Sequence, residues 1–432
     1  MSVQTRGKAL SLRTVEKCES IIMDHSIWGN LQPEIIEHIL SFLPVKHLCR
    51  FKCISTSWNS IISSPNFAKT HRHITNNTPN RPQKTLLITC SLHLCSVDFV
   101  AMNPTAERLA FFGLSDPNQV RVWGSCNGLV LISANGTFYN LYLLNPFTRE
   151  CKKLPDCPLF DCCPYNIDYD VVANGFGYDS SMNDYKVVML HFPDLPNASK
   201  VAVYSLKTDA WRRIQDICYD FDLEEYNRRG CFFNERLHWW FWDCTDGSIG
   251  LVSFDLSDEI FRKVDLPTSF SSCYNIDGGV EYLYSLVPGS CLCLVVSPYS
   301  LVVSPYSNAS EIDVWMMTKY GVRESWTKVT IPNHGMLGED IFKIPTHGMA
   351  VEDVLFFAAK EEFLLRMIEK VNGVAVQPGR KKLIVYNQKN NTVRDMVVCS
   401  FPEYTLGGNY FETLVSPDHG RQIWRTYEPT LG

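Results

Sequence analysis

The 432-residue sequence predicts an α+β protein of several domains, with a short helical domain near the N-terminus and a long all-β part after it. Apolar residues recur at helical spacing between residues 33 and 62. From about residue 84 this spacing gives way to short β-rich runs separated by Gly, Asn, Asp and Pro. A hairpin pattern recurs along this second part, which predicts a closed ring of similar sheets.

Charge is unevenly distributed along the chain, whose formal net charge is −6. Residues 1–82 contain ten Lys or Arg and five Asp or Glu, a net charge of +5. Residues 83–432 contain thirty and forty-one, a net charge of −11. We therefore expect the two parts to bind different partners.

The cysteine content and the N-terminus bear on the compartment. Seventeen cysteines without a framework spacing indicate reduced thiols, and the first twenty residues lack the apolar core of a secretory signal. No run approaches the ~20 apolar residues of a membrane span. We expect a soluble protein of the cytoplasm, with the nucleus as a second compartment, that binds neither membranes nor nucleic acid.

The helical part is predicted to contain three short helices. Apolar residues from Ile35 to Leu43 cover more than one face of the first helix. Pro44 ends this helix and can begin the second, since proline fits a first turn but not a helix interior. Ser55 or Thr56 caps the third helix, which Pro65 is expected to end. A domain this small buries little surface, so its uncovered apolar side should be completed either by another protein or by the rest of this chain.

The segment from Leu31 to Phe67 resembles an F-box, in particular the plant form with Leu-Pro-Val-Lys and Arg-Phe-Lys-Cys. Two departures are Gln32, where the family has proline, and Ser55-Thr56, which replace Cys-Lys. The resemblance implies docking onto a Skp-type adaptor and, through it, onto the cullin of a ubiquitin ligase. The expected adaptor-binding residues are Leu31, Pro33, Ile35, Ile36, Ile39, Leu40, Leu43, Pro44, Val45, Leu48, Phe51, Trp58 and Ile61.

The β-rich part repeats two hairpins, of which the second contains an apolar strand, a tight polar turn and a strand with a bulky residue. Examples of this second hairpin are "VAVYSLKTDAWRRI" and "LVSFDLSDEIFRKVDLP". Two hairpins make a four-stranded blade, and five such pairs can be drawn. Residues 84–99 and 410–417 would add one or two blades by closing the ring without an exposed sheet edge. The prediction is a kelch-like β-propeller of about six to seven blades.

These repeats also resemble the plant F-box-associated domain, through "GSCNGLVLI", "LLNPFTRECKKLP", "GFGYDSSMNDYKVV" and "SFDLSDEIFRKVDLP". The combination is typical of plant F-box/kelch-like proteins, a class that includes the S-locus F-box proteins of self-incompatibility. It implies a substrate receptor of a ubiquitin ligase that directs its target to the proteasome and has no active site or cofactor. The expected organisation is a flexible segment 1–27, an F-box 28–72, a linker 73–84, a propeller 85–417 and a tail 418–432.

Other readings of the sequence remain open. "RLHWWFWD" (236–243) could form an aromatic cage, but the alternation of a blade strand favours packing. The cysteines of "CPLFDCC" (157–163) lack the paired spacing of a zinc site, and we expect no metal. Motifs of nucleotide-binding proteins, zinc proteases and hydrolases are absent from the sequence. A propeller enzyme with an active site in its central channel is the alternative.

Substrate recognition is expected on one face of the ring. Strand reversal places the loops between strands two and three, and those between blades, on the same face, and these are the long connections. Acidic residues gather there, so we expect a protein substrate that is neutral to basic. The expected substrate-binding residues are Asp168, Asp170, Asp220, Asp222, Glu224 and Glu225.

Overall fold

The fold is taken from a computed structural model, which divides into two compact units, Met1–Thr78 and Pro79–Gly432. Each unit is described by itself. The structure describes residues 32–76, 83–89, 94–98, 106–109, 120–134, 140–160, 171–192, 199–217, 219, 228–243, 248–268, 270, 280–286, 291–298, 312–331, 347–357, 362–371, 374–375, 381–387, 389–390, 392–396 and 404–418.

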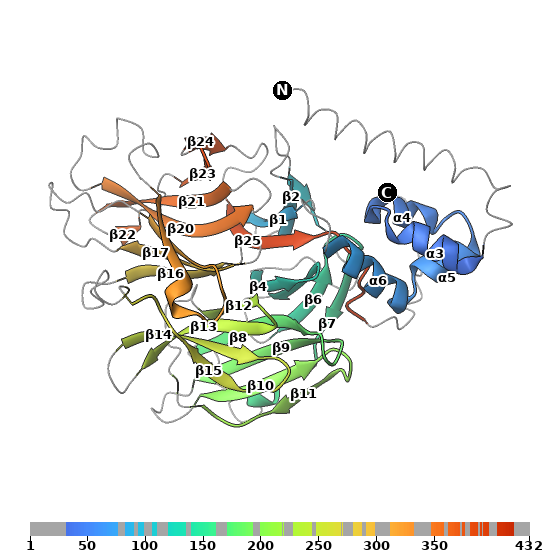
Figure 1. The fold of residues 1–432 in the computed structure, drawn as a ribbon, viewed down its shortest axis with the longest axis horizontal. Helices are drawn as coiled ribbons and strands as arrows, with labels where there is room; N and C mark the ends of the chain where they lie inside the picture. Colours follow the sequence, from blue (N-terminus) through green and yellow to red (C-terminus); the bar gives the residue numbers. More distant parts are fainter. Residues whose placement is uncertain are drawn as a thin grey trace. The chain divides into compact units, whose positions relative to one another are not determined.

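The described part of the N-terminal unit contains four helices rather than the three we expected (Figure 1). They are α3 (Pro33–Ser41), α4 (Val45–Phe51), α5 (Thr56–Ile62) and α6 (Pro65–Asn76). Pro65 begins α6 instead of ending the helical region. The Ser64 hydroxyl accepts a hydrogen bond from the Phe67 backbone N–H at 3.1 Å, and a proline at the first helical position lacks only an N–H that would be unpaired there. Residues 73–76 of the expected linker therefore belong to a helix.

The four helices share a core of large apolar side chains. Leu40, Leu48 and Phe67 are completely buried, and the Phe51 and Trp58 rings meet edge to face with centroids 5.6 Å apart. The buried His71 ring is 2.8 Å from the Leu43 carbonyl oxygen, so α6 is tied to the segment that follows α3. The third helix begins as the sequence predicts, because the Ser55 hydroxyl accepts a hydrogen bond from the Trp58 N–H.

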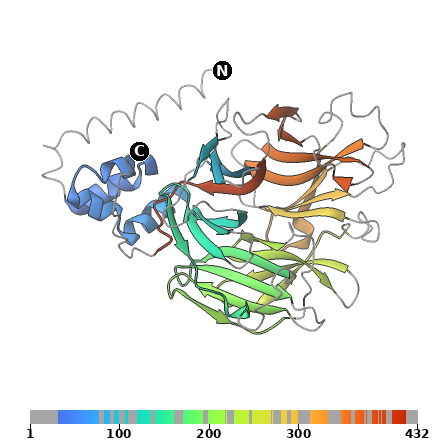
Figure 2. The same ribbon diagram turned by 180° about the vertical axis from the view of Figure 1, so that it is seen from behind.

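The second unit is a β-propeller of six four-stranded blades within the described residues (Figures 1 and 2). Blade 1 is β25 (Tyr404–Phe411), β1 (Gln83–Thr89), β2 (Leu94–Val97) and β3 (Ala106–Arg108); blade 2 is β4 (Arg121–Cys126), β5 (Leu129–Ser133), β6 (Leu141–Asn145) and β7 (Glu150–Lys153). Blade 3 is β8 (Val171–Asp179), β9 (Asp184–Phe192), β10 (Lys200–Ser205) and β11 (Ala210–Arg213); blade 4 is β12 (Arg229–Phe233), β13 (Arg236–Asp243), β14 (Ser248–Asp255) and β15 (Phe261–Val264).

The remaining two blades follow the same order. Blade 5 is β16 (Val280–Leu286), β17 (Leu292–Pro298), β18 (Ile312–Met317) and β19 (Trp326–Ile331). Blade 6 is β20 (His347–Phe357), β21 (Glu362–Val371), β23 (Lys381–Asn387) and β24 (Thr392–Met396), with the short β22 (Val374–Ala375) paired to β21.

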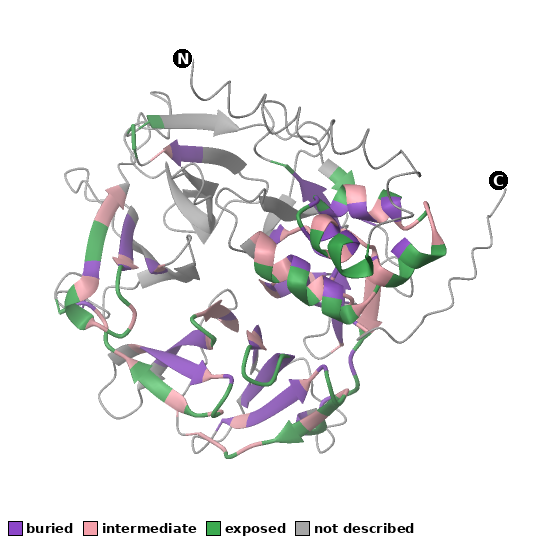
Figure 3. Ribbon diagram, turned by 45° about the vertical axis from the view of Figure 1, so that its right-hand side comes forward, coloured by how far each residue is buried: buried purple, intermediate pink, exposed green. Residues whose placement is uncertain are grey.

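The ring closes by sharing blade 1 between the two ends of the unit, as predicted, but the closing strand is Tyr404–Phe411 rather than residues 410–417. The last strand, β25, pairs antiparallel with β1, and it contacts both β4 and β20. Inner strands of neighbouring blades contact one another around the unit, except that blade 5 meets blade 4 through β16 and β13, so the sheets follow one another in a circle (Figure 3). A propeller closed in this way leaves no broken sheet at its seam.

Blades 3 and 4 are joined more tightly than a propeller requires. Their inner strands, β8 and β12, pair parallel, so the two blades form one eight-stranded sheet. Glycines permit this approach: a Cβ atom on Gly175 or Gly230 would lie 2.4–2.6 Å from the Trp239 ring, closer than atoms can pack. Trp239 itself is buried. The sequence pattern gave no sign of this fusion.

The turns between third and fourth strands repeat one design in blades 2, 3 and 4. In each, a polar residue at the end of the third strand accepts at least one hydrogen bond from a backbone N–H group of the turn. A residue one or two places before the fourth strand has a positive φ, as in a type I turn followed by a left-handed residue. The acceptors are Asn145, Ser205 and Asp255. The left-handed residues are Arg149, Asp209 and Glu259, with φ of 64°, 57° and 60°.

Candidate interaction surfaces

The predicted adaptor-binding residues divide between the core and the surface of the N-terminal unit. Leu31 lies outside the described residues. Five others are exposed or partly exposed: Pro33, Ile35, Ile39, Pro44 and Ile61. The remaining seven are buried: Ile36, Leu40, Leu43, Val45, Leu48, Phe51 and Trp58. The buried seven hold the helices together in this conformation, whereas the exposed ones are free to meet a partner.

Phe42 is the surface residue that the sequence analysis missed. It is 61% exposed and follows α3 directly, where its ring meets the His38 ring edge-on at 5.1 Å. Ile35, on the first turn of the same helix, is 45% exposed. We counted Phe42 as neither core nor docking residue, because the helical spacing passes over it. Two large exposed apolar side chains on one short helix mark a surface that another protein can cover.

The predicted substrate-binding residues cannot be placed. Asp168, Asp170, Asp220, Asp222, Glu224 and Glu225 all lie outside the described residues. The described elements on either side of these residues can be placed. η1 (Pro158–Phe160) follows blade 2 and β8 begins at Val171, while β11 ends at Arg213 and β12 begins at Arg229; by strand reversal, the end of the last strand of one blade and the start of the next blade lie on the face that we predicted for recognition.

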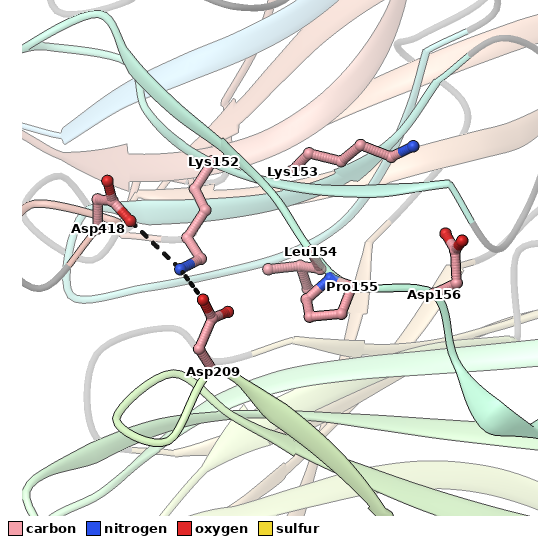
Figure 4. A pocket seen from close by; sticks show the side chains of 7 residues that line it. All are labelled: Lys152, Lys153, Leu154, Pro155, Asp156, Asp209 and Asp418. Atoms are coloured by element: carbon pink, nitrogen blue, oxygen red, sulfur yellow. Dashed lines mark hydrogen bonds and ion pairs between the residues drawn. The ribbon is translucent and has the colours of Figure 1, made fainter. Parts of the chain in front are cut away.

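A polar pocket of about 490 Å³ lies between the outer strands of blades 2 and 3 (Figure 4). Its lining residues are Lys152, Lys153, Leu154, Pro155, Asp156, Asp209 and Asp418. The Lys152 ammonium group points between two carboxylates, 2.9 Å from Asp209 and 3.2 Å from Asp418, and Lys153 points away from this pair. Asp209 also accepts a hydrogen bond from the Tyr204 hydroxyl. Burial raises the pKa of this hydroxyl above its ordinary value.

These contacts join blades 2 and 3 around the pocket. The Trp211 indole N–H donates to the Pro155 carbonyl at 2.7 Å and crosses from blade 3 to blade 2. Lys152 is neutralised by two partners, and Asp209 is held by a donor on each side. No nucleophile paired with a general base lines the pocket among its described residues.

The comparisons with known proteins agree with both units. A model of the F-box domain matches residues 28–70, and a model of the F-box associated beta propeller domain matches residues 83–416, more than half of the chain. The chain belongs to the F-box associated β-propeller family. The helices α3 to α6 are therefore its F-box, and the six blades are its F-box associated propeller.

Relatives of this F-box protein occur in Arabidopsis thaliana. "F-box protein CPR1" is 31% identical over 316 residues, which cover 68% of this chain and 71% of the relative. "F-box/kelch-repeat protein At3g23880" is 29% identical over 308 residues, covering 69% of this chain and 79% of the relative. The solved structure of a nidogen/laminin complex covers 77% of this chain with a TM-score of 0.37 at 7% identity, a similarity too low to carry an inference.

The aromatic strand of this F-box protein packs as the sequence predicts. Trp239 and Trp240 are buried, and Trp240 stacks on Phe270 with centroids 6.0 Å apart. His238, between them and blade 5, is 2.7 Å from the Tyr320 hydroxyl. Burial lowers the pKa of His238 to about 4, because the imidazolium form would lose its hydration. The strand is a joint between blades.

The cysteines and the expected absence of a metal can be followed only in part. Cys157 is buried, while Cys162 and Cys163 lie outside the described residues. Within the described ranges, no group of three His, Cys, Asp or Glu could hold a metal ion. Burial raises the pKa of Cys151 and of Cys231 to about 12, which makes both poor nucleophiles.

No helix of the described part is long and apolar enough to cross a membrane.

Proposed function

We propose that this protein is the substrate-recognition subunit of a Skp-cullin-F-box ubiquitin ligase, and that it directs a protein target to the proteasome. The observation that carries the proposal is the presence of an F-box and an F-box associated propeller in one chain. The F-box implies binding to a Skp-type adaptor, and the propeller supplies a scaffold of six blades whose connections can carry a recognition site. Other subunits would carry out ubiquitin transfer.

The adaptor would meet the exposed apolar residues of the F-box. Ile35 and Phe42 lie at the two ends of α3, and Ile39, partly exposed, lies between them. Side chains at i, i+4 and i+7 share one face of a helix, which makes a stripe that a partner can bury. Removing such side chains from water stabilises a complex by roughly 25 cal/mol per Å² of apolar area, before the costs of association.

The substrate would be a protein that is neutral to basic. This proposal rests on the net charge of −11 over residues 83–432 and on the acidic loops 161–170 and 220–227 of the recognition face. Complementary charge speeds association and disfavours like-charged competitors. Membership of the S-locus class, whose targets are basic ribonucleases, would agree with a substrate of positive charge. The identity of the captured substrate would decide whether the protein belongs to that class.

A propeller enzyme remains the second candidate, and the described inner strands argue against it. Between blades 2, 3 and 4 these strands contact one another, and β8 and β12 pair directly. A Cβ atom on Gly124 of β4 would lie in van der Waals contact with Phe176 of β8, at 3.8 Å, and with the Gly230 carbonyl oxygen of β12, at 3.9 Å. These three inner strands therefore pack closely on one another. The domain composition likewise indicates an adaptor rather than an enzyme.

Affinity capture from plant tissue with the proteasome blocked tests the proposed function. The intact protein is expected to capture a Skp-type adaptor, a cullin and ubiquitinated substrate. The variant I35D/F42D is expected to lose the adaptor and cullin and to keep the substrate, now without added ubiquitin. A matched control, M182D/I260D, changes two equally exposed apolar residues of the propeller. Capture of no adaptor by the intact protein would contradict the proposal.

A further inference from the structure

The propeller has its own pair of large exposed apolar side chains, on the face opposite the long loops. Met182 is 57% exposed in the turn between β8 and β9, and Ile260 is 50% exposed just before β15. They are the two described propeller residues of this kind. Their turns touch across the junction of blades 3 and 4, because the hydroxyl oxygens of Ser181 and Ser257 lie 3.1 Å apart. The turns that carry Met182 and Ile260 therefore adjoin at the surface.

The junction of blades 3 and 4 contains two largely buried carboxylates, Asp179 and Glu259. Lys186 is 2.9 Å from Asp179 and 3.0 Å from Glu259, and its ammonium group also donates to the Leu256 carbonyl. Burial alone would raise the pKa of Asp179, but hydrogen bonds from Ser181 and Lys186 outweigh it and hold that pKa below its ordinary value. Asp179 therefore stays ionised, and Lys186 forms ion pairs with both carboxylates.

The cations around the pair face outward. Arg212 reaches from blade 3 to the Glu259 carboxylate, and its side chain is 56% exposed against 12% for Glu259. Arg262 lies two residues beyond Ile260, and its side chain is 47% exposed and pairs with Asp258. The Lys207 ammonium group donates to the Met182 carbonyl. Each guanidinium carries five N–H donors, so Arg212 and Arg262 keep donors for a further carboxylate.

We propose that this surface, the junction patch of Met182, Lys207, Arg212, Ile260 and Arg262, binds an extended acidic segment of a protein partner. An apolar side chain of the segment would cover Met182 and Ile260, and its neighbouring carboxylates would meet Arg212 and Arg262. The exposed acids nearby, Asp258 and Glu235, are fewer than the three cations. The patch is separate from the recognition loops, so this partner differs from the neutral to basic substrate.

Fluorescence anisotropy on the full-length protein tests the proposal, with labelled nine-residue peptide pools as probes. One pool combines Asp and Glu with Leu and Phe, and the other replaces the acids with Lys and Arg. We expect the acidic pool to bind and to weaken with added salt. We expect M182S/I260S to reduce its affinity at least tenfold, and R262Q severalfold, since both sites are exposed and the fold is kept.

The matched control is I35S/F42S, which removes the same kind of side chain from the F-box and should bind the acidic pool like the intact protein. Equal binding of the two pools, or unchanged binding by M182S/I260S, would overturn the proposal. Concentration-dependent dimers that M182S/I260S abolishes would overturn it as well, because a second copy would then occupy the patch. Adaptor capture in the same preparations shows separately whether the proposed F-box function holds.

Discussion

The F-box and the propeller bury their apolar side chains in different ways. The F-box core depends on single large residues, such as Leu40, Leu48 and Phe67, each of which fills a different space between helices. The propeller core is built from repeated hairpins, in which equivalent positions carry different residues. On the fourth strands of blades 3 and 5, Trp211 and Trp326 each donate an indole N–H hydrogen bond to a carbonyl oxygen of the segment that follows the preceding blade. At the equivalent position of blade 4, Phe261 packs on Phe254 instead. We therefore expect a single core substitution to destabilise the F-box strongly. In the propeller we expect the most destabilising substitutions to lie at the contacts between blades.

The largest effect is expected at such a joint. Replacing Lys186 with Met would leave the buried Asp179 without its cation, while Glu259 would keep only Arg212. Breaking a buried ion pair from one side typically costs about 3–5 kcal/mol. Chemical denaturation of the full-length protein should show this loss in the β-sheet transition. K207M changes an exposed lysine one strand away and should alter the midpoint little.

A somewhat smaller loss is expected in the F-box core. Leu48→Ala removes a completely buried side chain and should destabilise the helical unit by about 2–5 kcal/mol, since so small a unit cannot collapse around the cavity. Thermal unfolding followed at 222 nm should show the helical signal lost at a lower temperature while the β signal keeps its midpoint. If both signals shift together, the units are not independent and the comparison fails.

The stability of the propeller should depend on pH through His238. Its pKa is about 4 in the folded protein and about 6.5 when unfolded, so between these values the unfolded chain binds more protons. Above pH 6.5 this group does not alter the free energy of unfolding, because it is neutral in both states. Below pH 6.5 the free energy of unfolding falls by about 1.4 kcal/mol per pH unit as the pH drops towards 4. H238Q should remove that part of the slope. An identical pH dependence of the intact protein and H238Q would contradict the assignment.

The smallest effects are expected in the repeated turns. Asn145 is buried, accepts hydrogen bonds from Phe147 and Thr148, and donates to the Thr413 and Val415 carbonyls, whereas Ser205 caps its own turn and bonds Asp184. A hydrogen bond contributes about 0.5–1.5 kcal/mol, so N145A should cost about twice as much as S205A. Equal losses in denaturant would mean that the contacts to the C-terminal segment add nothing.

The sequence was most informative where a residue acts through its neighbours along the chain. Ser55 as a helix cap, the hairpin turns and the closing strand β25 all follow from local patterns. Pro65 was misread because a proline can end one helix or begin another, and Ser64, which decides between them, looks like any polar residue. The family resemblance supplied the F-box, but periodicity alone could not separate core from docking residues.

What the sequence could not show are contacts between distant segments. Lys186 and Glu259 belong to different blades, and the fusion of β8 with β12 depends on two glycines that face one tryptophan. Phe42 escaped notice because exposure depends on which face the other helices cover. For the same reason Leu43 and Trp58, which we expected at the docking surface, are core residues, and polar replacements there would unfold the F-box rather than report on binding.

The central claim is that the two exposed apolar pairs serve different partners, Ile35 and Phe42 the adaptor and Met182 and Ile260 another protein. Titration of a purified Skp-type adaptor against the intact protein, I35S/F42S and M182S/I260S tests it most directly, after circular dichroism has shown that all three are folded. We predict that I35S/F42S weakens adaptor binding at least tenfold and that M182S/I260S binds like the intact protein. Unchanged binding by I35S/F42S, or an equal loss in both variants, would contradict the claim.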